Sequence, residues 1–185
     1  MQLSSFLFPL LVFLSCSSCG TDITTGEATV IPPESPSGGE DTPTTTTSLS
    51  AAAISLNTEA LQMVNQQRQQ GCRCGNQNMP PVPPLSRNDV LVITADDHSK
   101  DMEQMNRMQH TGSDGSSSGD RLTRNGYRWR AVGENIARGQ TSIAQVVNGW
   151  FDSPGHCRNL MSANFTHFGM ARSGFFWTQV FAAPF

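Results

Sequence analysis

Three stretches in the second half of the chain decide the fold: Gly133-Glu134-Asn135-Ile136-Ala137, then Trp150-Phe151-Asp152-Ser153-Pro154-Gly155-His156-Cys157-Arg158-Asn159-Leu160, then Trp177-Thr178-Gln179. Upstream of them, His110-Thr111-Gly112 adds a second imidazole. A charged residue between a glycine and an apolar run, as at Glu134, needs a cation, a metal or hydrogen-bond donors around it. The stretches therefore predict one small domain in which a carboxylate and two imidazoles come from separate elements.

These motifs, in this order, resemble those of the CAP superfamily of cysteine-rich secretory proteins, antigen 5 and plant pathogenesis-related proteins, in its bacterial SCP-like form. The resemblance covers residues 57–183 and implies an α+β fold, a three-layer α-β-α sandwich with a small antiparallel sheet. It also implies that His110 and Glu134 line a shared cavity, with His156 as a third member. Animal members carry a further histidine two residues before Thr-Gln, whereas Trp177 directly precedes Thr178-Gln179 here. The resemblance therefore does not extend to the fourth residue of the site that animal members carry.

Composition bounds the classes of function. The chain has 185 residues and a formal net charge of -3, and it contains no basic run. The electrostatic footprint of a nucleic-acid binder is therefore missing, and no nucleic-acid partner is expected. The uneven composition predicts one folded domain, residues 53–185, behind an N-terminal extension.

The N-terminal extension is typical of an exported protein. Residues 3–14 are apolar, too few to span a bilayer but enough for the core of a signal peptide, residues 1–19, of lipoprotein type. Cys16 and Cys19 are rival acylation sites, and the alternative to export is a buried apolar helix. Residues 20–52 are rich in Thr, Pro, Ser and Gly and predict a disordered tether to a membrane anchor.

The remaining cysteines favour a disulfide. Cys157 is expected to pair with either Cys74 or Cys72, because exported domains commonly form such distant bridges. A metal site at Cys72-Arg73-Cys74 is less favoured, since zinc sites usually have two to four intervening residues.

Periodicity predicts the helices. Asn57 is a plausible cap for a helix over residues 57–70, and residues 86–89 open a second helix that runs to Met108. His98 lies on the apolar face of this second helix and is interpreted as a core histidine, with a secondary role in the site left open. In a continuous helix His110 lies about 18 Å further along the axis. The two rings are then not expected to share a ligand.

The rest of the domain alternates helices and strands. Asp120 can cap a helix over residues 120–125, and Arg121 is expected to anchor a carboxylate or the chain itself. His167, just before a strand, is expected to be exposed. The other expected elements are a strand over 132–138, a helix over 142–151 and paired strands over 168–171 and 175–181 joined at 173–174.

Three hypotheses compete for the chemistry of the site. In the first, His110, Glu134 and His156 hold a divalent metal, zinc or magnesium, with an open position for water, and the protein is a metal-dependent hydrolase. No His-Glu-x-x-His or Gly-x-Ser-x-Gly motif supports catalysis.

In the second hypothesis the cleft recognises an envelope glycan, peptide or lipid, with His98, Asp120, Arg121 and Gln179 as secondary residues. The resemblance allows a lipid, because lipid and sterol binding is associated with CAP proteins. In the third, the polar cluster only stabilises the domain, and the function belongs to its variable surface. The sequence favours an exported, lipid-anchored binding protein, with the hydrolase as the alternative.

Overall fold

A four-stranded sheet forms the middle layer of the fold. The structure is a computed structural model that describes residues 48–185. The strand order is β3-β5-β6-β4, with β6 antiparallel to both β5 and β4 and the two-residue β3 parallel to β5. The strands are β3 (Ser86–Arg87), β4 (Trp129–Arg138), β5 (His167–Ser173) and β6 (Phe176–Pro184). The antiparallel C-terminal pair is confirmed, and the parallel edge strand β3 was not predicted.

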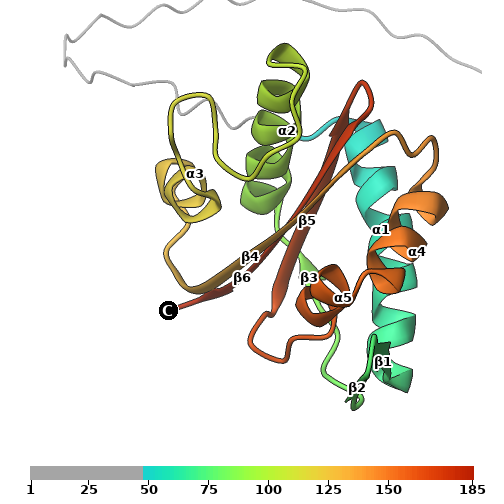
Figure 1. The fold of residues 1–185 in the computed structure, drawn as a ribbon. Helices are drawn as coiled ribbons and strands as arrows, with labels where there is room; N and C mark the ends of the chain where they lie inside the picture. The colour runs from blue at the N-terminus through green and yellow to red at the C-terminus, as the bar shows by residue number, and fades with distance from the viewer. Residues whose placement is uncertain (1–47) are drawn as a thin grey trace, which may run out of the picture. The chain divides into compact units, whose positions relative to one another are not determined.

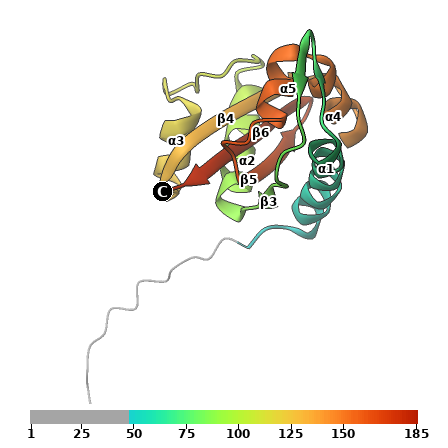
Figure 2. The same cartoon turned by 90° about the horizontal axis from the view of Figure 1, so that it is seen from below.

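Helices cover both faces of this sheet, as Figures 1 and 2 show. One face carries α1 (Ala51–Gln70), α4 (Ile143–Asp152) and α5 (Pro154–Leu160), and the other carries α2 (Asp89–Gln104) and α3 (Ser118–Arg124). The α+β class and the three-layer α-β-α sandwich are therefore confirmed. A separate hairpin of β1 (Cys72–Cys74) and β2 (Gln77–Met79) lies beside α5.

Each face has its own apolar core. Trp150 of α4 and Trp177 of β6 are buried in the first, and their indole N–H groups donate to backbone carbonyls at Ile136 and Gln140. The second core lies between α2, α3 and the sheet, around Leu91 and Leu122. Alternation along β6 sends successive side chains to opposite cores, because the side-chain period of a strand is two.

The first helix is longer than predicted, because it begins at Ala51 and is capped by Ser50 rather than by Asn57. Three alanines at its start favour the helix strongly. Asn57 instead lies buried inside the helix, where its side chain donates to the carbonyl of Met170 and accepts from the Met170 N–H, both at 2.8 Å. The predicted cap is thus a connector between α1 and β5.

Arg68, near the end of α1, is fully buried and has no acidic partner within salt-bridge distance among residues 48–185. Its guanidinium donates to the carbonyls of Pro83, Leu160 and Ser162 at 2.6 to 3.0 Å. Burial lowers its pKa to about 10. One side chain thereby joins α1, the proline-rich segment 80–84 between β2 and β3, and the end of α5.

The predicted signal peptide, the acylation sites Cys16 and Cys19 and most of the predicted tether lie outside the described residues. The tether's last residues, 51 and 52, belong to α1, so the folded part begins slightly earlier than residue 53. Within residues 48–185, no helix has the length and apolar character needed to cross a membrane.

Candidate functional site

Glu134 is the centre of the polar cluster. It lies in β4, opposite Val180 of β6, and only 3% of its side chain is exposed. One carboxylate oxygen, Oε1, lies 2.8 Å from His110 Nδ1, and the other, Oε2, accepts from Arg121 Nη2 at 2.6 Å. These donors explain how a charge is tolerated between a glycine and an apolar run.

His110 reaches Glu134 because α2 ends four residues earlier than predicted. The chain reverses after Gln104, with Asn106 in the left-handed region at a φ of 48°. The reversal brings both imidazoles to the same carboxylate, since His98 Nε2 lies 3.8 Å from Glu134 Oε1. The expectation that the two rings are far apart was therefore wrong, because it assumed a continuous helix.

His98 itself has the character of a core residue. It is fully buried, and its Nε2 lies 2.9 Å from the carbonyl of Gln109, which ties α2 to the loop that carries His110. Its Nδ1 is 4.0 Å from Asp101 and has no hydrogen-bond partner. Burial lowers its pKa despite the nearby Glu134 carboxylate, so the neutral ring is favoured.

Arg121 anchors the cluster from α3 and binds a carboxylate, as expected of this arginine. Besides Glu134, its guanidinium donates to the carbonyls of Ser116 and His110 at 2.9 and 3.1 Å. Asp120 is not part of the cluster. It is exposed, and with the N-cap Ser117 it forms the capping box of α3. Asp120 therefore sets the start of the helix that presents Arg121.

His156 comes from α5 and is joined to β4 through its backbone carbonyl. Its carbonyl accepts from Asn135 Nδ2 at 3.3 Å, and Asn135 in turn contacts Gln179 and Asn159 at 3.0 and 2.9 Å. Asn159 also donates to the Glu134 carbonyl at 3.2 Å. Gln179 is fully buried and its Nε2 has no partner, so it lies in the support of the site rather than at its surface.

The roles of Asn135 and Asn159 were missed from the sequence. Both belong to the quoted motifs, and a polar side chain within a buried strand segment, as at Asn135, was the available signal.

The two site histidines have opposite electrostatic surroundings. The hydrogen bond to Glu134 raises the pKa of His110, whose side chain is 61% exposed. Burial, followed by the nearby His110, lowers the pKa of His156. The surroundings thus favour a protonated ring at one position and a neutral ring at the other.

His167 lies apart from this cluster. Its Nδ1 is 2.6 Å from the Tyr127 hydroxyl, and the ring is half-buried at the start of β5 rather than exposed as predicted.

A metal ion would find few free ligands here. Both Glu134 oxygens are engaged, which leaves ring nitrogens of His110 and His156 as available donors. In residues 48–185 the one group of three His, Cys, Asp or Glu ligand atoms within 4.8 Å of one another is Cys72, Cys74 and Cys157. Glu134 suits the role of a carboxylate that orients a ligating histidine, rather than that of a direct ligand.

Two cavities lie beside the helices, but neither is lined by His110 or Glu134. A cavity of about 640 Å³ lies between the start of α1 and α2, lined by apolar residues such as Leu56 and Val92 and by Lys100. A smaller one of about 200 Å³, between α2 and α3, includes Arg121 in its lining. The titratable groups with opposed pKa shifts remain at the Glu134 cluster.

A sequence model of the cysteine-rich secretory protein (CAP) family matches residues 61–181. The chain belongs to the CAP family. Its fold is thus that of a CAP domain.

This CAP domain is similar to several bacterial proteins. The uncharacterized protein YkwD of Bacillus subtilis (strain 168) is 33% identical over 140 residues, which is 74% of this chain and 51% of YkwD. The chain therefore spans about half the length of that relative.

Among solved structures, an extracellular SCP-domain protein of Bacillus anthracis shares 26% identity at a TM-score of 0.63, covering 73% of this chain and 44% of that one. An outer surface protein of Borrelia burgdorferi, 18% identical with a TM-score of 0.57 over 71% and 92% of the two chains, shares the fold.

The disulfide of this domain joins Cys74 to Cys157, with a Cα–Cα distance of 5.4 Å. It links the β1–β2 hairpin to α5, one residue after His156. The sequence left Cys74 and Cys72 as alternative partners, and the structure selects Cys74.

Proposed function

We propose that the protein is exported and lipid-anchored through Cys16 or Cys19, and that its CAP domain binds an envelope or extracellular ligand at His110, Glu134 and His156. The observation that carries the proposal is an exposed imidazole whose orientation is fixed by a buried carboxylate. The solved bacterial relative with the higher TM-score is described as extracellular, which supports export.

The chemistry of the two rings indicates what such a ligand must offer. His110 in its protonated form donates hydrogen bonds, whereas a neutral His156 can accept one. The charge of Arg121 is balanced by Glu134, so the protonated His110 adds net positive charge to the site. A glycan, peptide or lipid headgroup that combines an anionic oxygen with a hydroxyl or amide donor fits this pair.

Any divalent ion at the site is proposed to be zinc rather than magnesium. Imidazole nitrogens suit zinc, whereas magnesium prefers oxygen ligands. His110 and His156 would hold the ion, and Glu134 would orient His110 from behind. Bound zinc supplies Lewis acidity toward a ligand oxygen.

A hydrolase is the second candidate function. A histidine held neutral and a neighbouring histidine held protonated are the states that a general base and a general acid require. The alternative of a purely stabilising cluster predicts that neither ring responds to any ligand.

The test is an NMR titration of the imidazole resonances in the folded domain. Envelope glycan fragments, anionic lipid micelles, a peptide and zinc chloride are added separately. Binding at the site should shift the His110 and His156 signals and leave the His167 signal unchanged, because His167 is hydrogen-bonded to Tyr127 outside the cluster. If all four additions leave His110 and His156 unmoved, the binding proposal fails.

A paired variant separates binding from stability. His110→Ala/His156→Ala should lose the response to the ligand that moved the wild-type signals while the remaining spectrum stays that of the folded domain. A variant that melts far lower and binds as well as wild type would favour the stabilising role.

A further inference from the structure

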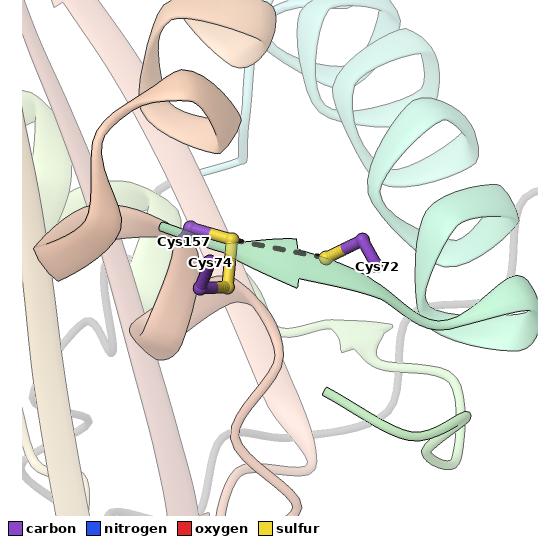
Figure 3. Close-up of side chains that lie close together, drawn as sticks. All are labelled: Cys72, Cys74 and Cys157. Atoms are coloured by element: carbon purple, nitrogen blue, oxygen red, sulfur yellow. Dashed lines mark hydrogen bonds between the residues drawn. A yellow bond between two sulfur atoms is a disulfide. The ribbon is translucent and has the colours of Figure 1, made fainter. Parts of the chain in front are cut away.

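Three sulfur atoms meet where the β1–β2 hairpin contacts α5. Cys74 and Cys157 form the disulfide, and the free thiol of Cys72 lies 3.7 Å from the Cys157 sulfur. Figure 3 shows Cys72 and Cys74 approaching Cys157 from the same strand. All three sulfurs lie within 4.8 Å of one another.

The strand explains why two cysteines compete for one partner. Cys72 and Cys74 are two residues apart in β1, so their side chains leave the same face, while Arg73 between them is exposed on the other. That face packs in an apolar cluster with Cys157 and Met161. Both thiols are therefore held against α5.

We propose that these cysteines form a thiol–disulfide exchange site, in which Cys72 displaces Cys74 from Cys157. The Cys72 thiolate attacks the Cys157 sulfur, a Cys72–Cys157 bond forms and the Cys74–Cys157 bond breaks. Cys74 leaves as a thiolate and takes up the proton that Cys72 released. One disulfide and one thiol exist before and after the step, so no external oxidant or reductant is needed.

The three cysteines differ in their exposure to solvent. Cys74 and Cys157 are 1% and 0% exposed, whereas Cys72 is half-buried. Cys72 is therefore the cysteine of the three that is most accessible to solvent. Burial raises the pKa of the Cys72 thiol, which makes the thiolate scarce at neutral pH and exchange faster in alkaline solution.

Exchange at this place changes the attachment of α5 at the residue that follows His156. Either linkage tethers α5 to the hairpin, but through residues two positions apart in β1. The inference concerns disulfide chemistry alone and stands whether or not the ligand proposal does.

The chain offers a direct assay, because trypsin cleaves after Arg73 and separates the two competing cysteines. The full chain with Cys16→Ser/Cys19→Ser is oxidised, incubated at pH 6.5 or 8.5, quenched in acid, and alkylated with N-ethylmaleimide in denaturant. Mass spectrometry then distinguishes residues 74–87 linked to 139–158 from residues 69–73 linked to 139–158.

Both linkages are expected, in a ratio that becomes constant with time. The approach to that ratio should accelerate by about tenfold per pH unit below the pKa of Cys72. A single Cys74–Cys157 linkage that persists throughout incubation at pH 8.5 would overturn the proposal.

Variants test the geometry independently. In the same Cys16→Ser/Cys19→Ser background, Cys74→Ser should oxidise to a Cys72–Cys157 bond and show no free thiol in denaturant, with the fold verified by circular dichroism. The matched control is Cys72→Ser/Arg73→Cys/Cys74→Ser, whose one hairpin thiol lies on the opposite face and should stay unpaired. Two free thiols in a folded Cys74→Ser variant, or a bond in the control, would each contradict the exchange site.

Discussion

Replacing Glu134 by glutamine should destabilise the domain by about 3 kcal/mol at pH 7, the lower end of the usual cost of removing one partner of a buried ion pair. The carboxylate and Arg121 are 3% and 7% exposed, so the substitution leaves a buried guanidinium without its counter-charge. Glutamine keeps one acceptor oxygen, which places the cost at the low end. The bond to His110 adds little to this figure, because that ring is 61% exposed to solvent.

The assay is urea unfolding followed by tryptophan fluorescence, which Trp150 and Trp177 report from the buried core. The expected loss corresponds to a melting temperature lower by about 10 °C for a domain of this size. Glu59→Gln is the matched control, since Glu59 is exposed on α1, and it should unfold as wild type does. A loss below about 1 kcal/mol for Glu134→Gln would refute the expectation that the substitution leaves Arg121 as a buried charge without a counter-charge.

The same variant has a second, independent readout. The hydrogen bond to Glu134 is the main cause of the raised His110 pKa, so Glu134→Gln should lower the pKa of His110. NMR titration of the ring measures this shift, and the His167 resonance serves as the internal reference. An unchanged His110 pKa would show that the two side chains do not interact in solution.

Other perturbations test other parts of the domain. Arg68→Met should cost about 3 kcal/mol, because it strands buried carbonyls that the guanidinium now satisfies, and urea unfolding measures it. Reducing the Cys74–Cys157 disulfide, with 83 residues of separation, should cost about 4 kcal/mol, and calorimetry with and without reductant checks it. Acid should destabilise the domain through His98, because the pKa of His98 is lower in the folded than in the unfolded chain. The contribution of His98 to the free energy of unfolding is complete above about pH 6.5 and is lost as the pH falls through the folded pKa. His98→Gln should flatten this decline in urea unfolding measured at several pH values. The pKa of His110 is raised, so its contribution to the free energy of unfolding is present below about pH 6.5 and is lost as the pH rises through the folded pKa. The unfolding curves of His110→Ala and wild type should therefore converge in alkaline solution.

Local signals in the sequence were sufficient for much of this fold. The helices and strands followed from apolar periods, the three layers from the resemblance to the CAP family, and the role of Arg121 from the affinity of a guanidinium for carboxylates. Glu134 stood out because a charge beside an apolar run needs a partner, whereas His110 and His156 were placed with it by the resemblance to the CAP family. Each of these inferences depends on a short segment whose preferences agree with the tertiary structure.

The failures arose where tertiary contacts override a local pattern. Asparagine is a favoured N-cap residue, but Asn57 lies inside the helix, where its side chain bonds to the backbone of Met170, 113 residues away in β5. The end of α2 was misplaced because the segment after Gln104 contains neither glycine nor proline, and the reversal depends on Asn106 adopting a positive φ. The same error separated His98 from His110. No periodicity indicates that Arg68 is buried, because two of its carbonyl acceptors lie 92 and 94 residues further along the chain.

The guanidinium of Arg68 finds its last two acceptors 92 and 94 residues further along the chain. A polypeptide made at about 5 to 20 residues per second thus keeps this charge in water for roughly 5 to 20 s before those carbonyls exist. The first helix cannot settle into its final place during that interval. The contacts that hold this helix in place are completed only after Ser162 has been added to the chain.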